Sequence, residues 1–206
     1  MRRLRFKSRE SGKDNTNAGQ KAAVRAYVLT ILGVARPAVL DCYCGSGVMH
    51  RRVWGAVSSA YVGLDSKEFN DDRETILCDN ARYLRMADLD RFDVFDLDAY
   101  GSAFYQFAII CRRLRWSRVK RVGIILTDGS GYNFKMNIAP SGLLDFLGLM
   151  RHRGASVQHE SRDAITQMAL RRAAGEAGAR MEDPKIIKRS GGADVWYLGF
   201  VLAREA

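Results

Sequence analysis

One ten-residue stretch, residues 93–102 (DVFDLDAYGS), combines carboxylates with an aromatic side chain. Asp96, Asp98 and Tyr100 alternate in it and follow apolar residues that indicate a buried strand. A carboxylate can accept the hydrogens of an exocyclic amine and aim the nitrogen lone pair at an electrophile, while a flat ring can hold a base. We therefore take Asp98 as the acceptor of the amine hydrogens and Tyr100 as the flat surface. Asp96 is either a further catalytic residue or a structural carboxylate, as a helix cap or in a buried pair.

A second stretch, VLDCYCGSG at residues 39–47, places Asp41 and a Gly-x-Gly turn after another apolar run. Gly45 and Gly47 permit a tight turn that a ligand can approach at bare backbone. The first amides of a following helix are free to donate to a carboxylate or a ribose. A turn with a purely structural role would have the same short pattern.

Acidic residues also follow the next two apolar runs. Asp65 comes directly after Val62-Gly63-Leu64, and a carboxylate in that place can accept both hydroxyls of a ribose. Asp79 and Asn80 come after a third run and are suited to hydrogen-bond the amino group of an adenine.

This order of residues resembles the cofactor-binding pattern of class I S-adenosylmethionine-dependent methyltransferases, over most of the chain. The resemblance implies S-adenosylmethionine as the cofactor, with its methionine part on the glycine-rich turn, its ribose on Asp65 and its adenine at Asp79. The cofactor-binding residues that it implies are Asp41, Tyr43, Gly45, Ser46, Gly47, Asp65, Asp79 and Asn80. Tyr43 replaces a further glycine of the family, and an aromatic residue there is familiar in its nucleic-acid-modifying branches. A dinucleotide-binding dehydrogenase fits less well, because His50 stands at the third glycine of G-x-G-x-x-G.

The stretch around Asp98 resembles the Asp-Pro-Tyr-Gly or Asp-Pro-Phe-Gly element of tRNA guanine-N2 methyltransferases, with Ala99 in place of the proline. Thr127 and Asp128 resemble a Thr-Asp pair of the same family and are candidate substrate-binding residues. The resemblance implies methyl transfer to an exocyclic amine by positioning, with no metal. Because the family's proline sets the backbone shape that presents a neighbouring carbonyl to the amine, Ala99 leaves open a different acceptor or a loss of activity.

Positive charge is in excess and clustered. The chain has 33 Lys and Arg against 23 Asp and Glu, a net charge of +10, and such a surface attracts polyanions. One cluster comprises Arg2, Arg3, Arg5, Lys7 and Arg9, and another comprises Arg112, Arg113, Arg115, Arg118, Lys120 and Arg121. We expect a nucleic-acid partner with Arg112, Arg113 and Arg115 on its phosphates. RNA is favoured over DNA, but the sequence leaves that choice open, as it does the base and the position that are modified. An ordinary solvated surface is the alternative.

Short apolar runs typical of strands alternate, along most of the chain, with segments that have the periodicity of helices. The predicted strands are 38–43, 60–64, 75–77, 93–97 and 121–126, followed by a hairpin of 186–188 and 195–202; the predicted helices are 22–32, 80–86, 104–114, 142–150 and 164–174, with another beginning at 48–53. This alternation predicts an α/β, Rossmann-like, doubly wound and mainly parallel seven-stranded sheet with a C-terminal antiparallel hairpin. Ligands bind such sheets beyond the carboxyl ends of the strands, which is where the motifs stand. Residues 129–135 are expected to form a loop or a base-stacking lid.

The 206 residues, 47% of them hydrophobic, fit one domain over residues 18–206, preceded by a basic, mobile arm at residues 1–17. With no apolar run of membrane-spanning length and no signal peptide, a soluble cytoplasmic protein without a membrane partner is expected. The sequence leaves two other functions open: a methyltransferase for a small molecule or protein, and an inactive nucleic-acid-binding protein with a methyltransferase fold. It leaves the oligomeric state open as well.

Overall fold

The computed structural model describes residues 17–69, 71–140, 143–144, 147–148, 161–189 and 194–205. The predicted arm, apart from Asn17, and most of the predicted helix 142–150 lie outside these residues.

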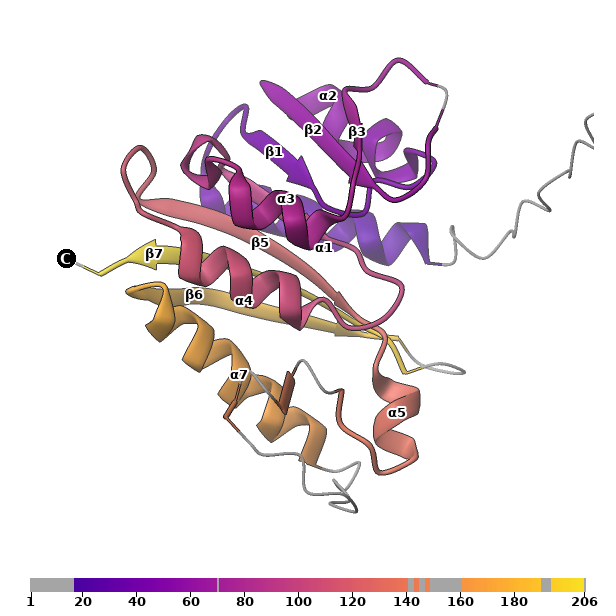
Figure 1. The fold of residues 1–206 in the computed structure, drawn as a ribbon, viewed down its shortest axis with the longest axis vertical. Coiled ribbons are helices and arrows are strands. Elements are labelled where there is room, and N and C mark those ends of the chain that lie inside the picture. The colour runs from indigo at the N-terminus through magenta and orange to yellow at the C-terminus, as the bar shows by residue number, and fades with distance from the viewer. Residues whose placement is uncertain are drawn as a thin grey trace, which may run out of the picture.

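A seven-stranded sheet runs through the described residues (Figure 1). Its strands are β1 (Ala38–Asp41), β2 (Ala60–Asp65), β3 (Thr75–Leu77), β4 (Val94–Leu97), β5 (Arg121–Asp128), β6 (Ala179–Lys188) and β7 (Trp196–Arg204). They lie in the order β3-β2-β1-β4-β5-β7-β6, with the first five parallel and β7 antiparallel to both of its neighbours. The predicted Rossmann-like sheet with a C-terminal antiparallel hairpin is confirmed.

Helices cover both faces of this sheet (Figure 1). One face carries α1 (Ala18–Leu32), the π-helical turn η1 (His50–Trp54) and α2 (Gly55–Val57); the other carries α3 (Asn80–Met86), α4 (Phe104–Arg113) and α7 (Arg162–Glu176). The short turns η2 (Leu89–Arg91) and α5 (Gly131–Lys135) connect elements. Side chains of successive strand residues point to opposite faces, so Val39 and Val94 pack in the core under α1 while Leu40 and Phe95 pack in the core under the other helices.

Two glycines let α1 lie close to the sheet. A Cβ on Gly199 of β7 would lie 2.7 Å from Val24 and 2.8 Å from Val28, and a Cβ on Gly123 of β5 would lie 2.6 Å from Val28. Both valines are fully buried. The position of α1 therefore depends on the absence of side chains at these two strand positions.

Several elements differ from the sequence-based prediction: α1 begins four residues earlier, β1 ends two residues earlier and β7 ends two residues later than predicted. β6 is much longer than the predicted 186–188, because its first half contains exposed charged residues and Pro184 next to a register shift, which hide the strand pattern. Residues 131–135, expected as a loop or lid, form α5, which fully buried Phe134 anchors. β5 continues two residues further than predicted, to Asp128.

The carboxyl ends of the parallel strands meet at one edge, where Asp41, Asp65 and Asp128 are the last residues of their strands. The first turns of α1 lie at the same edge, since Lys21 contacts Asp98 there. Within the described residues, no helix has the length and apolar character needed to cross a membrane.

Candidate active site

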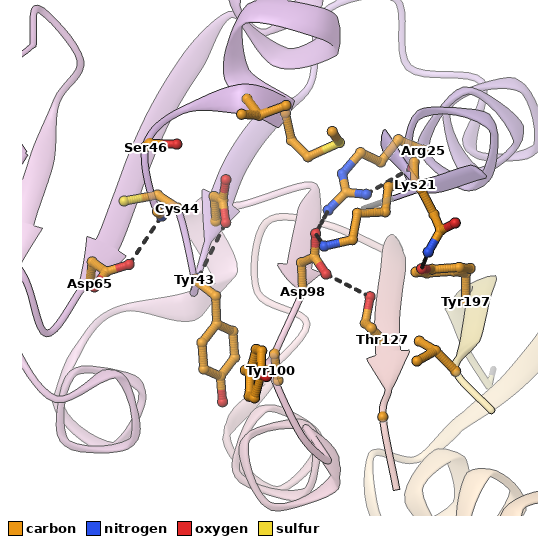
Figure 2. A pocket seen from close by; sticks show the side chains of 18 of the residues that line it. Lys21, Arg25, Tyr43, Cys44, Ser46, Asp65, Asp98, Tyr100, Thr127 and Tyr197 are labelled. Carbon is orange, nitrogen blue, oxygen red and sulfur yellow. Dashed lines mark hydrogen bonds and ion pairs between the residues drawn. The ribbon is translucent and has the colours of Figure 1, made fainter. Parts of the chain in front are cut away.

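A cavity of about 550 Å³ opens at this edge (Figure 2). We call the part lined by Tyr43, Gly45, Ser46 and Asp65 the glycine-turn side. The part lined by Asn17, Lys21, Arg189 and Tyr197 is called the α1 side. Asp98, Tyr100 and Thr127 lie between the two sides.

Asp65 connects the glycine turn to the end of β2. Its Oδ2 accepts a hydrogen bond from the Gly45 amide at 3.0 Å, and its Oδ1 accepts one from the Lys67 amide at 2.9 Å. Gly45 has φ of 46°, a left-handed conformation that favours glycine. The predicted residues Tyr43, Gly45, Ser46 and Asp65 are thus brought together around one part of the cavity.

Gly47 makes room for a side chain and does not line the cavity. A Cβ on this residue would lie 2.7 Å from Cζ of Arg73. The Arg73 guanidinium donates to the carbonyl oxygens of Cys44, at 3.1 Å, and Gly45, at 2.8 Å, and pairs with Asp71. The second glycine of the motif therefore lets a buried arginine hold the turn from behind.

Asp41 lies at the floor of the cavity with 2% of its surface exposed. It accepts hydrogen bonds from the Tyr61 hydroxyl, at 2.9 Å, and the Tyr43 amide, at 3.2 Å. Burial, with the nearby Asp96 charge adding to it, raises the pKa of Asp41 well above the usual aspartate value. The carboxyl group thus favours its protonated form more than an exposed aspartate does.

The structure does not bring Asp79 and Asn80 to the cavity wall. Asp79 is the N-cap of α3, where its side chain accepts a hydrogen bond from the Arg82 amide at 2.7 Å. The Asn80 side chain donates to the Cys42 carbonyl, at 3.0 Å, and accepts from Gln106, at 3.1 Å. Their expected contact with adenine stays a prediction.

Asp98 is the carboxylate at the centre of the cavity (Figure 2). Its Oδ1 accepts a hydrogen bond from the Thr127 hydroxyl at 2.9 Å, and its Oδ2 lies 2.8 Å from Lys21 Nζ and 3.2 Å from an Arg25 nitrogen. Burial alone would raise the pKa of Asp98, but the charges of Arg25 and Lys21 outweigh it, so this pKa lies below its usual value. Asp98 is therefore ionised at neutral pH and acts only as an acceptor.

Asp96 has the buried-pair role that the sequence left open. It is fully buried and does not line the cavity. Arg25 binds it through two hydrogen bonds of 2.7 Å, and the Trp54 indole donates to it at 2.8 Å. These contacts use both carboxylate oxygens, so Asp96 fixes Arg25 behind Asp98.

Tyr100 and Ala99 shape the mouth of the cavity. Tyr100 is 87% exposed, and Figure 2 shows its ring and that of Tyr43 pointing to the same side. The Ala99 amide donates to the Leu97 carbonyl at 3.0 Å, a hydrogen bond that proline cannot make. The turn that carries Asp98 is therefore closed by a backbone hydrogen bond that the proline of the Asp-Pro-Tyr-Gly element could not make.

Of the predicted Thr-Asp pair, only Thr127 faces the cavity. Asp128 is fully buried, pairs with Arg162 at 2.9 Å and accepts from the Ser130 amide at 3.1 Å. Its side chain holds α7 and the turn after β5 in place. The expectation that it contacts substrate is not supported by this position.

Arg112, Arg113 and Arg115 also lie away from the cavity. They are at or just beyond the carboxyl end of α4, which runs antiparallel to the strands and so ends at their amino edge (Figure 1). The Arg112 side chain pairs with Glu176 at 2.6 Å, and that of Arg113 donates to the Ala87 carbonyl at 3.1 Å. A ligand confined to the cavity does not reach them.

The sequence analysis missed the residues of the α1 side and Arg25. Lys21 and Arg25 share one helical stripe with Val28 and Leu32, and a cation at a core-facing helix position indicates a buried ion pair. That stripe was available in the sequence. Arg189, which follows β6, has no comparable pattern around it.

No protein-family model matches the chain, and no curated protein matches it. Several solved structures are similar to it in fold. Trm1 from Pyrococcus horikoshii with S-adenosyl-L-methionine has a TM-score of 0.59 and 16% identity over 92% of this chain and 55% of that one. A protein from Streptococcus thermophilus described as a hemolysin has a TM-score of 0.58 and 12% identity, over 100% of this chain and 70% of that one.

A third solved structure is Burkholderia thailandensis 1,6-didemethyltoxoflavin-N1-methyltransferase with 1,6-didemethyltoxoflavin and S-adenosylhomocysteine. Its TM-score is 0.52 and its identity 11%, over 92% of this chain and 80% of that one. The chain spans about half the length of Trm1. At these identities the likeness establishes the fold, which is the Rossmann-like fold of class I methyltransferases.

Proposed function

We propose that the chain is an S-adenosylmethionine-dependent methyltransferase that methylates an exocyclic amine of a nucleic-acid base, RNA more than DNA. The observation that carries this proposal is one cavity in which a glycine turn with an acidic partner adjoins an ionised carboxylate and an exposed tyrosine. Solved structures of the same fold that contain S-adenosylmethionine or its demethylated product support it.

The residues present fit this cofactor. The cavity of about 550 Å³ lies within the range of small-molecule sites, roughly 300 to 1,000 Å³. Each Asp65 oxygen accepts one amide hydrogen bond and keeps a further lone pair for a ribose hydroxyl. Gly45 and Ser46 offer backbone for the methionine part. When bound there, S-adenosylmethionine supplies an electrophilic methyl group.

Asp98 would orient the amine that accepts this methyl group. A carboxylate has about four lone-pair positions, and Thr127, Lys21 and Arg25 occupy three of those on Asp98. One position remains for a hydrogen of the acceptor amine, which aims the nitrogen lone pair away from Asp98. Tyr100 would hold the plane of the base by stacking.

A small-molecule methyltransferase is the second candidate. The cavity alone favours it, because Arg112, Arg113 and Arg115 lie at the opposite edge of the sheet and contribute no charge to the cavity wall. In that case the same Asp98 arrangement would act on an amine of a free metabolite.

The first test is binding of S-adenosylhomocysteine by calorimetry. We expect the wild type to bind, and Asp65→Ala to weaken binding by about 1 to 3 kcal/mol, through the loss of charge-assisted hydrogen bonds to ribose. Asp72→Ala is the control, because Asp72 is an exposed acid in the loop that follows β2. No binding by the folded wild type would overturn the proposed function, and unchanged affinity in Asp65→Ala would overturn the ribose assignment.

The second test identifies the acceptor. The protein is incubated with labelled donor and separate pools of tRNA, rRNA and DNA, which are then digested to nucleosides. We expect label in an amino-methylated nucleoside. Cofactor binding without label in any pool would favour the small-molecule candidate, whereas RNA binding without cofactor binding would indicate the inactive nucleic-acid-binding protein.

A further inference from the structure

The α1 side of the cavity contains two cationic side chains with different partners. Lys21 forms an ion pair with Asp98 at 2.8 Å. Arg189, directly after β6, is half-buried and lines the cavity. No ion pair joins Arg189 to a carboxylate among the described residues, and its guanidinium contacts a side-chain amide.

That amide belongs to Asn17, the residue before α1. In the orientation that satisfies its neighbours, the Asn17 oxygen accepts hydrogen bonds from Arg189 Nε, at 3.2 Å, Arg189 Nη1, at 3.3 Å, and the Tyr197 hydroxyl, at 3.2 Å. Asn17 has φ of 67°, a left-handed conformation that asparagine tolerates better than most residues. Parts of the chain 180 residues apart thus cooperate to hold one guanidinium at the cavity wall.

The guanidinium keeps donors for a ligand. Arginine has five N–H groups in a rigid fork, and two of them point to Asn17. The remaining three, two on Nη2 and one on Nη1, suit the oxygens of a phosphate, which arginine binds with two parallel hydrogen bonds. The same cavity wall contains Asp98, which accepts hydrogens and does not donate them.

We propose that Arg189 binds a phosphate group of the methyl acceptor, so that the acceptor is a nucleotide unit with its amine at Asp98 and its phosphate at Arg189. This inference rests on the proposed function and adds a phosphate-binding residue to it. The net charge of +10 favours phosphate over a free carboxylate, because it attracts polyanions to the molecule before they enter the cavity. Asn17 is the positioning residue for Arg189.

The test compares nucleotides with nucleosides. Binding of the four ribonucleoside 5′-monophosphates and of the matching nucleosides is measured with S-adenosylhomocysteine present. We expect at least one monophosphate to bind tenfold or more tightly than its nucleoside, and Arg189→Gln to abolish this preference. Arg36→Gln, at an exposed arginine in the loop between α1 and β1, should retain it. Asn17→Gly keeps the left-handed backbone but removes the amide oxygen, and it should reduce the preference with the positive charge intact.

Three outcomes overturn the proposal: equal binding of nucleotides and nucleosides, a preference that survives Arg189→Gln, or competition by benzoate as effective as that by the monophosphate. Mixed-sequence RNA oligonucleotides identify the source of the phosphate, since tighter binding than the monophosphate indicates a polynucleotide and equal binding a free nucleotide. The proposed function fails separately. If S-adenosylhomocysteine does not bind but the preference for the monophosphate depends on Arg189, the phosphate site is supported and the proposed methyltransferase function is overturned.

Discussion

Asp96 and Asp98 are two residues apart and have different partners. Arg25 contacts both carboxylates. The other partner of Asp96 is Trp54, whereas those of Asp98 are Lys21 and Thr127, and Asp98 remains at the cavity. The sequence favoured Asp98 of the two, because it stands at the aspartate of the Asp-Pro-Tyr-Gly element that this stretch resembles. The role of Asp96 could not be settled from the sequence, because its partner comes from a helix 71 residues earlier.

Replacing Asp98 should separate catalysis from cofactor binding. We expect Asp98→Ala to lower kcat by about a hundredfold or more and to change the Kd of S-adenosylhomocysteine by less than about threefold, since the role proposed for Asp98 is to orient the acceptor. Because the pKa of Asp98 is lowered, its contribution to activity should persist at neutral pH and be lost only in acid, as the pH falls through that pKa. Kinetics and calorimetry on the same preparation provide both values. If kcat and the affinity for S-adenosylhomocysteine fall together, Asp98 belongs to the cofactor site or is needed for the fold.

Asp41 provides a pH-dependent prediction about stability. Its folded-state pKa is raised by burial above the value in the unfolded chain, so the native state binds more protons and loses stability as the pH rises between the two pKa values. Asp41→Asn removes this dependence. We expect the free energy of unfolding of the variant, relative to the wild type, to increase by at least about 1 kcal/mol between pH 5 and pH 8. Urea unfolding across this range measures it, with Asp72→Asn as an exposed control. A constant difference would mean that Asp41 titrates normally.

At the scale of elements, apolar runs and turn residues predicted most of the sheet. β3 and α3 have their predicted bounds, because each is a short uninterrupted pattern. β6 was recognised only at its end, since pairing with β7, and not its own alternation, makes residues 179–185 a strand. The place of α1 at the cavity was also missed: the sequence showed a helix, but only the packing shows that its first turns reach the cavity.

The close approach of α1 to the sheet leads to an element-scale prediction. Gly199→Ala should lower the free energy of unfolding by about 1 to 3 kcal/mol, because the new methyl group would overlap Val24 and Val28. As α1 contains Lys21 and Arg25, turnover should fall as well. Gly175→Ala in α7 is the matched control, with nothing within 4 Å of its Cβ, and it should gain up to about 1 kcal/mol. Urea midpoints of the two variants test the argument; equal midpoints would show that the helix shifts at no cost.

At the scale of the molecule, the net charge of +10 led to the expectation of a nucleic-acid partner, but the sequence could not show on which edge of the sheet each basic cluster lies. The cluster that begins at Arg112 follows α4 to the amino edge, opposite the cavity. Only a long polyanion can contact both edges at once.

This separation predicts a length-dependent effect of salt. Each phosphate neutralised contributes about 0.7 to 0.9 to the slope of log affinity against log salt. Replacing Arg112, Arg113 and Arg115 by glutamine should flatten this slope for a folded RNA of tRNA size and leave it unchanged for a short oligonucleotide, with cofactor affinity unaffected. Filter binding at several salt concentrations tests this prediction. A slope near zero for the wild type would favour the small-molecule candidate, and equal flattening for both RNAs would place the three arginines near the cavity.

The insertion of β7 between β5 and β6 has a consequence for the chain during its synthesis. Tyr197 leaves the ribosome 180 residues after Asn17, to which it is hydrogen-bonded in the folded protein. At roughly 5 to 20 residues per second, this delay is about 9 to 36 s. Within this delay, β5 has an unpaired edge open to other strands from its own synthesis until β7 appears, and α1 lacks the glycine-bearing surface of β7 on which it packs. The glycine turn can form on the nascent chain long before Arg189 and Tyr197 exist, so translation assembles the two sides of the cavity in a fixed order.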